Sequence, residues 1–160
     1  MNVFKSSSKS LFLICPTWNL ENKIRVKHGL NAYFLTALGG IFHIDAQTAE
    51  HIKCFIRKNR INKINIVINP SCKFIQNVLN PKEFNNTKAE QLLTEIYHTN
   101  YSSIEEENKT HFEKCNLLST ERALMQLKQL MKLDFIKEKV QNKELDICLL
   151  SIHKQPKVNQ

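Results

Sequence analysis

Residues 64–72 read Ile-Asn-Ile-Val-Ile-Asn-Pro-Ser-Cys, an apolar run that leads through a proline turn to Cys72. A similar run, Leu-Phe-Leu-Ile at residues 11–14, leads directly to Cys15. Nearly continuous runs of Ile, Leu, Val and Phe are typical of strands that are covered on both faces. Because parallel strands end at the same edge of a sheet, we expect Cys15 and Cys72 to meet there. Thiols are soft metal ligands, so this edge is a candidate metal site.

Two more apolar runs, and the helical patterns between the runs, complete the predicted fold. Strands are expected at about 10–15, 32–37, 64–69 and 145–151. The alternation of strands and helices favours an α/β fold with a mostly parallel sheet of about four main strands, flanked by helices and joined by right-handed crossovers. A length of 160 residues suits a single domain, 1–160. Ligands of such sheets bind beyond the carboxyl ends of the strands.

The helices are predicted from capping residues and from apolar residues that recur on one face. Asp45 is expected to cap a helix over 46–59, and Thr87 forms a capping box with Glu90. A second capping box at 103–106 is expected to open a polar helix that runs towards Cys115. Further helices are expected from Ser119 or Thr120 over about 123–131, after the Pro70-Ser71 turn over 72–79, and over 135–140.

The formal net charge of +8 lies in the first half of the chain, where it is densest over residues 53–63. Such a basic segment is compatible with an alternative function, the binding of nucleic acid or of an acidic partner. No stacking aromatics alternate with the charges, however, so a solvated helix end is favoured and nucleic acid is not expected. The chain has no apolar run long enough to span a membrane, and a cytoplasmic protein is expected. Its five cysteines then favour reduced thiols, with Cys54 and Cys148 as small buried hydrophobes.

Four segments in order resemble the β-class carbonic anhydrases. Residues 13–19, Leu-Ile-Cys-Pro-Thr-Trp-Asn, are similar to the family's strand that runs into Cys-x-Asp-x-Arg. Residues 32–40 are similar to its second strand and Gly-Gly turn, and residues 66–72 to its third strand, which runs into His-x-x-Cys. Residues 124–154 are similar to its closing helices and last strand. The resemblance implies the β-carbonic-anhydrase fold and places the family's zinc site at the predicted sheet edge.

The same resemblance implies that the zinc site is degenerate. Cys15 and Cys72 stand at the family's two thiolate positions, but the position of its histidine ligand holds Asn69. The family's aspartate and arginine pair, which gates the fourth position on zinc, is replaced by Thr17 and Asn19. An amide is a poor zinc ligand beside an imidazole. We therefore expect a binding or structural module without carbon dioxide hydration, and no cofactor.

Two other uses of this site stay open. If His43, or His28, supplied a third ligand, the chain would be a zinc-dependent carbonic anhydrase. Alternatively, the amide groups that open the helix after Ser71, together with Lys73 and the turn at Gly39-Gly40, would hold a small anion in the vestigial pocket. Family members commonly dimerise, so a homodimer is the expected assembly.

Overall fold

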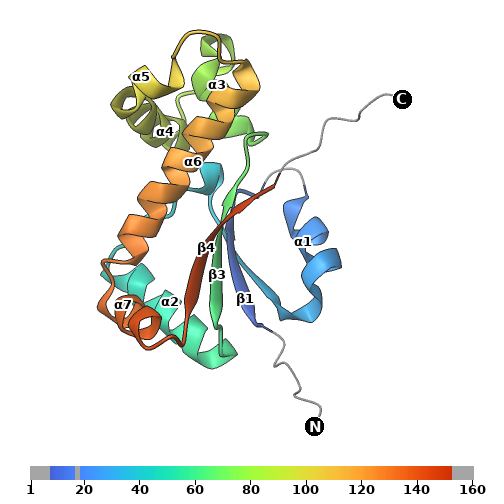
Figure 1. The fold of residues 1–160 in the computed structure, drawn as a ribbon, viewed down its shortest axis with the longest axis vertical. Coiled ribbons are helices and arrows are strands. Elements are labelled where there is room, and N and C mark those ends of the chain that lie inside the picture. The colour runs from blue at the N-terminus through green and yellow to red at the C-terminus, as the bar shows by residue number, and fades with distance from the viewer. Residues whose placement is uncertain (1–7, 17–18, 153–160) are drawn as a thin grey trace.

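The computed structural model describes residues 8–16 and 19–152 of the chain (Figure 1). Within these residues the four predicted strands are joined by seven α-helices, with short 3₁₀ turns between several of them. The strands are β1 Ser10–Ile14, β2 Ala32–Thr36, β3 Lys63–Ile68 and β4 Asp146–Ser151. The helices are α1 Leu20–His28, α2 Ala46–Asn59, α3 Lys73–Leu79, α4 Lys88–Thr99, α5 Tyr101–Ile104, α6 His111–Leu130 and α7 Asp134–Gln141.

The four strands form one sheet in the order β2-β1-β3-β4, and every neighbouring pair is parallel. Leu13 of β1 lies opposite Leu35 of β2 and Ile66 of β3, so the three strands keep a common register. The predicted α/β fold with a parallel sheet of four strands is therefore confirmed. Because all strands run the same way, their carboxyl ends share one edge of the sheet.

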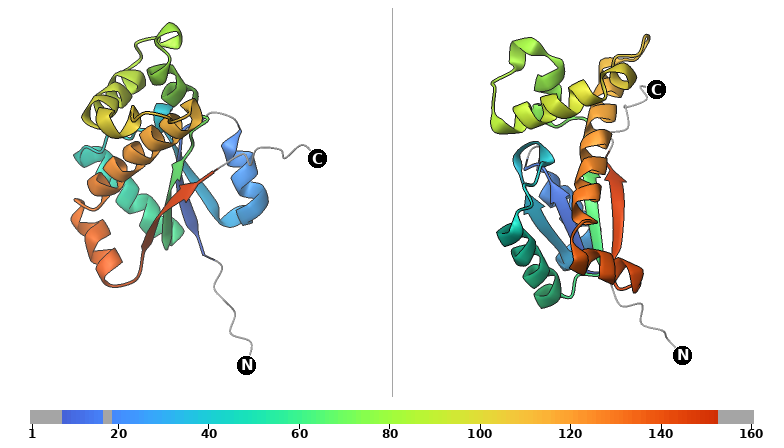
Figure 2. Two further views of the ribbon diagram at one scale, coloured as in Figure 1. Left: turned by 45° about the horizontal axis from the view of Figure 1, so that its top comes forward. Right: turned by 90° about the vertical axis from the view of Figure 1, so that its left-hand side faces the viewer.

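The two faces of the sheet are covered by different helices (Figures 1 and 2). On one face, α2, α6 and α7 pack over alternate strand residues such as Leu11, Leu13, Ile64 and Ile66. On the other face, α1 packs against the residues that alternate with them, and these include Phe12. Residues of the central strands β1 and β3 are therefore buried on both sides, which explains their continuous apolar runs.

A third apolar cluster lies beyond the carboxyl ends of the strands. Helices α3, α4 and α5, with the first half of α6, form a cap above this edge of the sheet (Figure 2). Leu93 of α4 and Leu118 of α6 are fully buried in the cap, and so is Ile75 of α3. Cys15 and Cys72 belong to this cluster. The cap therefore closes the expected site from above.

The predicted start of α4 is confirmed, whereas two predicted helix starts are wrong. Thr87 and Glu90 form the expected capping box. The box at 103–106 does not exist, because Ser103 lies inside the short helix α5 and α6 begins at a different capping box, Thr110 with Glu113. Ser119 and Thr120 cap nothing: α6 runs unbroken through them to Leu130. The sequence analysis also missed α1 entirely.

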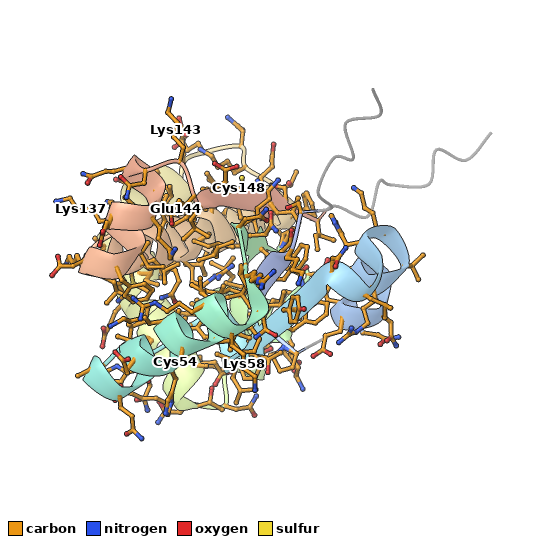
Figure 3. All side chains as sticks on the ribbon, turned by 90° about the horizontal axis from the view of Figure 1, so that it is seen from below. Cys54, Lys58, Lys137, Lys143, Glu144 and Cys148 are labelled. Carbon is orange, nitrogen blue, oxygen red and sulfur yellow. The ribbon has the colours of Figure 1, made fainter. Side chains whose placement is uncertain are left out.

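The environments predicted for two cysteines need correction. Cys54 is exposed on α2 rather than buried, and Cys148 on the edge strand β4 is only half-buried. Figure 3 shows Cys54 beside Lys58 on α2, well apart from Cys148. None of the five cysteines, all within the described residues, forms a disulfide. Within residues 8–16 and 19–152, no helix has the length and apolar character that crossing a membrane requires.

Candidate functional site

Cys15 and Cys72 meet where β1 and β3 end, as the sequence predicts. Both residues are buried: Cys15 is 6% exposed and Cys72 is 2% exposed. The two side chains are in hydrogen-bonding contact. This hydrogen bond raises the pKa of the Cys72 thiol, and burial and the charge of Cys15 raise it further. Cys72 therefore keeps its proton at neutral pH.

The turn that follows β3 fixes the orientation of Asn69. The backbone N–H of Cys72 donates to the carbonyl of Asn69 (3.1 Å), and the N–H of Ser71 donates to the Asn69 side-chain oxygen Oδ1 (3.1 Å). The backbone N–H of Asn69 donates to Oγ of Ser119 on α6 (2.9 Å). The buried Nδ2 of Asn69 has no hydrogen-bond partner within the structure. The amide therefore offers the pocket a donor, because its acceptor is already engaged.

A buried arginine, which the sequence analysis did not single out, completes the site. Arg122 of α6 is 3% exposed. Its Nη1 donates to the carbonyl of Gly40 (2.9 Å), and its Nη2 donates to the carbonyl of Val67 in β3. Its Nε is buried without a hydrogen-bond partner. Burial lowers the pKa of Arg122 to about 10, although the charges of Cys72 and Cys15 act to raise it. The guanidinium is therefore positive at neutral pH.

The Gly-Gly turn is shaped around this arginine. Gly40 has a φ of +67°, and a Cβ there would lie 2.8 Å from Nη1 and 3.1 Å from Cζ of Arg122. A glycine therefore meets two needs at position 40, the left-handed backbone and the close approach of the guanidinium. Gly39, whose φ is also +67°, packs against Leu93 and Ala89 of the cap instead. Of the two glycines, only Gly40 lies against the guanidinium of Arg122.

Three polar side chains of α6 explain how the site is held together. Ser119 receives the N–H of Asn69, Arg122 binds Gly40 and Val67, and Oε1 of Gln126 accepts the N–H of Phe42 (2.9 Å). These three residues are each at least 97% buried. Their spacing of three and four residues places them on one face of the helix. In the sequence these three residues do not stand out from the exposed polar residues of α6, so no sequence signal pointed to Arg122.

Four other residues were predicted for the site: Thr17, Asn19, Ser71 and Lys73. Thr17 falls outside the described residues. Asn19 precedes α1, where its Oδ1 accepts a hydrogen bond from Nδ2 of Asn22 (2.6 Å). Lys73 is exposed, and the N–H of Ser71 is already bound by Asn69. The anion site predicted at Ser71 and Lys73 therefore has neither an inward-facing cation nor a free Ser71 amide.

The two substitute ligands considered from the sequence are not gathered with the cysteines. His43 lines a mostly apolar groove with residues of α4 and α6, among them Leu92 and Met125. The ring of His28 packs on Phe12, and the charge of Lys63, at the start of β3, acts on it. His28 therefore lies towards the opposite edge of the sheet. Over the residues that the structure describes, no three His, Cys, Asp or Glu side chains cluster as metal ligands would.

The donor set at the sheet edge does not fit zinc. Zinc sites in proteins use three or four thiolate, imidazole or carboxylate ligands. Here Cys15 and Cys72 share a hydrogen bond, the neighbouring amide presents an N–H donor, and a buried guanidinium lies beside them. A second cation at these strand ends would be repelled by Arg122.

The parallel sheet, its helical cap and the turns at the strand ends together make the α/β fold of the β-carbonic anhydrases. CafD from Aspergillus fumigatus, a β-carbonic anhydrase, is 15% identical over 95% of this chain and 87% of its own, with a TM-score of 0.75. Tetrameric β-carbonic anhydrases from Sordaria macrospora give a TM-score of 0.75 at 11% identity, over 91% of this chain and 75% of theirs. The Coccomyxa β-carbonic anhydrase in complex with acetazolamide gives 0.65 at 9% identity, over 91% and 68%. No family sequence model and no curated protein matches the chain.

The basic segment at residues 53–63 lies at the other edge of the sheet. It spans the end of α2 and the start of β3, and Arg57 and Lys58 are exposed in the last helical turn. Cations there complement the helix dipole, which accounts for the charge without a nucleic-acid partner. The fold likewise does not favour the nucleic-acid alternative.

Proposed function

We propose that this chain is a carbonic-anhydrase-like protein whose degenerate centre neither holds zinc nor hydrates carbon dioxide, and that it acts as a binding or structural module. The observation that carries the proposal is Arg122, a buried cation beside Cys15 and Cys72. Asn69 supports it, because the side chain at the family's histidine position presents a donor. Zinc enzymes make hydroxide at neutral pH by lowering the pKa of metal-bound water to about 7. A centre without the metal cannot make hydroxide in this way.

Elemental analysis tests this proposal directly. Protein purified under reducing conditions without added metal is expected to hold close to zero zinc per chain and to show no carbon dioxide hydration in a stopped-flow assay. A zinc content near one per chain would refute the proposal.

A matched pair of variants identifies which residue excludes the metal. The variant Asn69→His supplies the missing imidazole but keeps the guanidinium, so it is expected to stay largely free of zinc. The double variant Asn69→His with Arg122→Leu removes both obstacles and is expected to gain zinc. If Asn69→His alone bound zinc as well as the double variant, Arg122 would not be the excluding charge.

We also propose that the chain self-associates as a homodimer in the cytoplasm. Two large apolar side chains support self-association, because Val26 at the end of α1 is 89% exposed and Leu30 beside it is 93% exposed. The structurally similar proteins from Sordaria macrospora are tetrameric. Light scattering is expected to give twice the chain mass, and the variant Val26→Lys with Leu30→Lys to give the mass of one chain. A wild-type protein of single-chain mass would refute the homodimer.

A further inference from the structure

We propose that the outer face of α4 and α6 is a docking surface for a second copy of this chain. The surface is separate from the exposed residues of α1 that support the homodimer, because α1 covers the opposite face of the sheet from α6 (Figure 2). The inference therefore goes beyond the proposed function and does not depend on the metal content of the chain.

An apolar groove runs between the two helices. It has a volume of about 620 Å³, and Leu92 of α4 and Met125 of α6 line it. A second hollow shares Ile96 and Met125 with the groove and continues along the same two helices. Leu38, which precedes the Gly-Gly turn, also lines the groove and is 54% exposed. Contiguous apolar surface with a polar rim is typical of an interaction site.

The two helices run in opposite directions along the groove. Lys88, at the start of α4, lines the same hollow as Gln129, near the end of α6. Thr99, at the end of α4, lines the same hollow as Glu121, halfway along α6. The groove therefore has one end near Lys88 and another near Glu121.

Each helix carries two opposite charges, seven residues apart, on this face. In α4 they are Lys88 and Glu95, and in α6 they are Glu121 and Lys128. Seven residues make about two helical turns, so the two charges of a helix lie on one side of it and about 10 Å apart. Because the helices are antiparallel, both lysines lie towards one end of the groove and both glutamates towards the other.

A face with this charge pattern is complementary to itself. A two-fold axis that lies in the face and crosses both helices brings up a second copy with the ends of its groove reversed. Lys88 of one copy then faces Glu95 of the other, Glu121 faces Lys128 in the same way, and the apolar middles of the grooves meet. A two-fold axis along the groove would instead place Lys88 over Lys128, where like charges repel. The charges therefore favour the first arrangement.

The four charged side chains are available for contacts between copies. None of the ion pairs within residues 8–16 and 19–152 includes any of them. Lys88, Glu95 and Lys128 are exposed, and Glu121 is half-buried. Pairs of exposed charges contribute little and are screened by salt. We therefore expect the contact at high protein concentration and low ionic strength, above the concentration at which the homodimer forms.

Sedimentation velocity of the full chain tests the docking surface. At low ionic strength, the mass of the wild-type particle is expected at least to double between micromolar and near-millimolar concentration. The doubling is expected whether the chain starts as a homodimer or as a single chain, so the result does not depend on the interface at Val26 and Leu30. A mass that stays constant over this range would refute the proposal.

Two variants with reversed charges identify the contact. Lys88→Glu places carboxylates opposite one another across the two-fold axis, and Glu95→Lys places ammonium groups opposite one another. Each variant alone is expected to associate roughly tenfold or more weakly than the wild type. An equimolar mixture of the two is expected to recover the association, because one copy then offers carboxylates at both positions and the other offers ammonium groups.

A matched control makes the same charge change elsewhere. Lys137 is exposed on α7, away from the cap (Figure 3). Lys137→Glu is expected to associate like the wild type and not to restore association when it is mixed with Glu95→Lys.

Two results with the variants would overturn the proposal. If either single variant associated as strongly as the wild type, the α4–α6 face would not be the contact. If the mixture stayed as weak as its components, the reciprocal pairing of Lys88 with Glu95 would be wrong. Neither result concerns zinc or carbon dioxide hydration, so the proposed function would stand or fall on its own measurements.

Discussion

Replacing Gly40 with alanine tests whether the Gly-Gly turn and Arg122 form one unit. The new Cβ would lie 2.8 Å from Nη1 and 3.1 Å from Cζ of the guanidinium. A surface arginine would move aside, but this one is 3% exposed and donates to the carbonyls of Gly40 and Val67. Relief of the clash therefore breaks at least one of these hydrogen bonds.

Two contributions set the magnitude of the effect. A non-glycine residue in the left-handed region, where Gly40 has a φ of +67°, costs about 1–2 kcal/mol. The loss of a buried hydrogen bond from a charged donor costs about 1.5–3 kcal/mol. The variant Gly40→Ala is therefore expected to lower the free energy of unfolding by about 2.5–5 kcal/mol.

Urea denaturation of a double-mutant cycle separates the two contributions. In the background Arg122→Leu the clash is absent, so Gly40→Ala should cost only the backbone strain of about 1–2 kcal/mol. The difference between the two backgrounds is the coupling between Gly40 and Arg122. If Gly40→Ala cost the same in both backgrounds, the glycine would serve the backbone alone, and the proposed packing against the guanidinium would be wrong.

Three further predictions concern the cap and the cysteines. The variant Thr87→Ala is expected to destabilise by about 2 kcal/mol in urea, against about 1 kcal/mol for Thr110→Ala, because the Glu90 that accepts from Thr87 is fully buried, whereas the Glu113 that accepts from Thr110 is exposed; equal losses would contradict this. Burial raises the pKa of Cys115 to about 11, so the native thiol keeps its proton between pH 9 and 11 while the unfolded thiol loses it. The stability that wild type gains over Cys115→Ala should therefore be complete below pH 9 and fall by about 2–3 kcal/mol as pH rises to 11, and a flat difference would refute it. Iodoacetamide with mass mapping should modify Cys54, which is exposed, well before Cys115 in the native protein; simultaneous labelling would contradict the burial of Cys115.

The sheet was predictable because its signal is local. Buried parallel strands need continuous apolar residues, and the four runs of this kind became β1 to β4. Helix starts were less certain, because serine, threonine and glutamate at the correct spacing also occur inside helices. Thr87 and Glu90 form a real box, whereas Ser119 lies inside α6 and uses its hydroxyl for the N–H of Asn69. A capping residue and a tertiary contact therefore look alike in the sequence.

The meeting of Cys15 and Cys72 could be predicted, but the chemistry of their pocket could not. Their approach follows from two parallel strands that end together. Arg122 lies 50 residues beyond Cys72, on a helix whose other inward residues are mostly apolar, and it enters the site only because α6 crosses the end of β3. An isolated arginine in a helix is normally exposed. Only the tertiary structure reveals that this one is buried.

Arg122 changes the charge at the strand ends where Cys15 and Cys72 meet. Two thiolates balance a zinc dication, so a β-carbonic-anhydrase centre with both cysteines ionised needs a metal. Here the hydrogen bond to Cys15 and burial raise the pKa of Cys72, and the buried guanidinium adds a positive charge beside the two cysteines. Two N–H groups of the site, Nε of Arg122 and Nδ2 of Asn69, are buried without a hydrogen-bond partner in the structure, so they add donors rather than metal ligands. The same two strand ends that could place thiolates around a metal therefore hold, in this chain, a buried guanidinium.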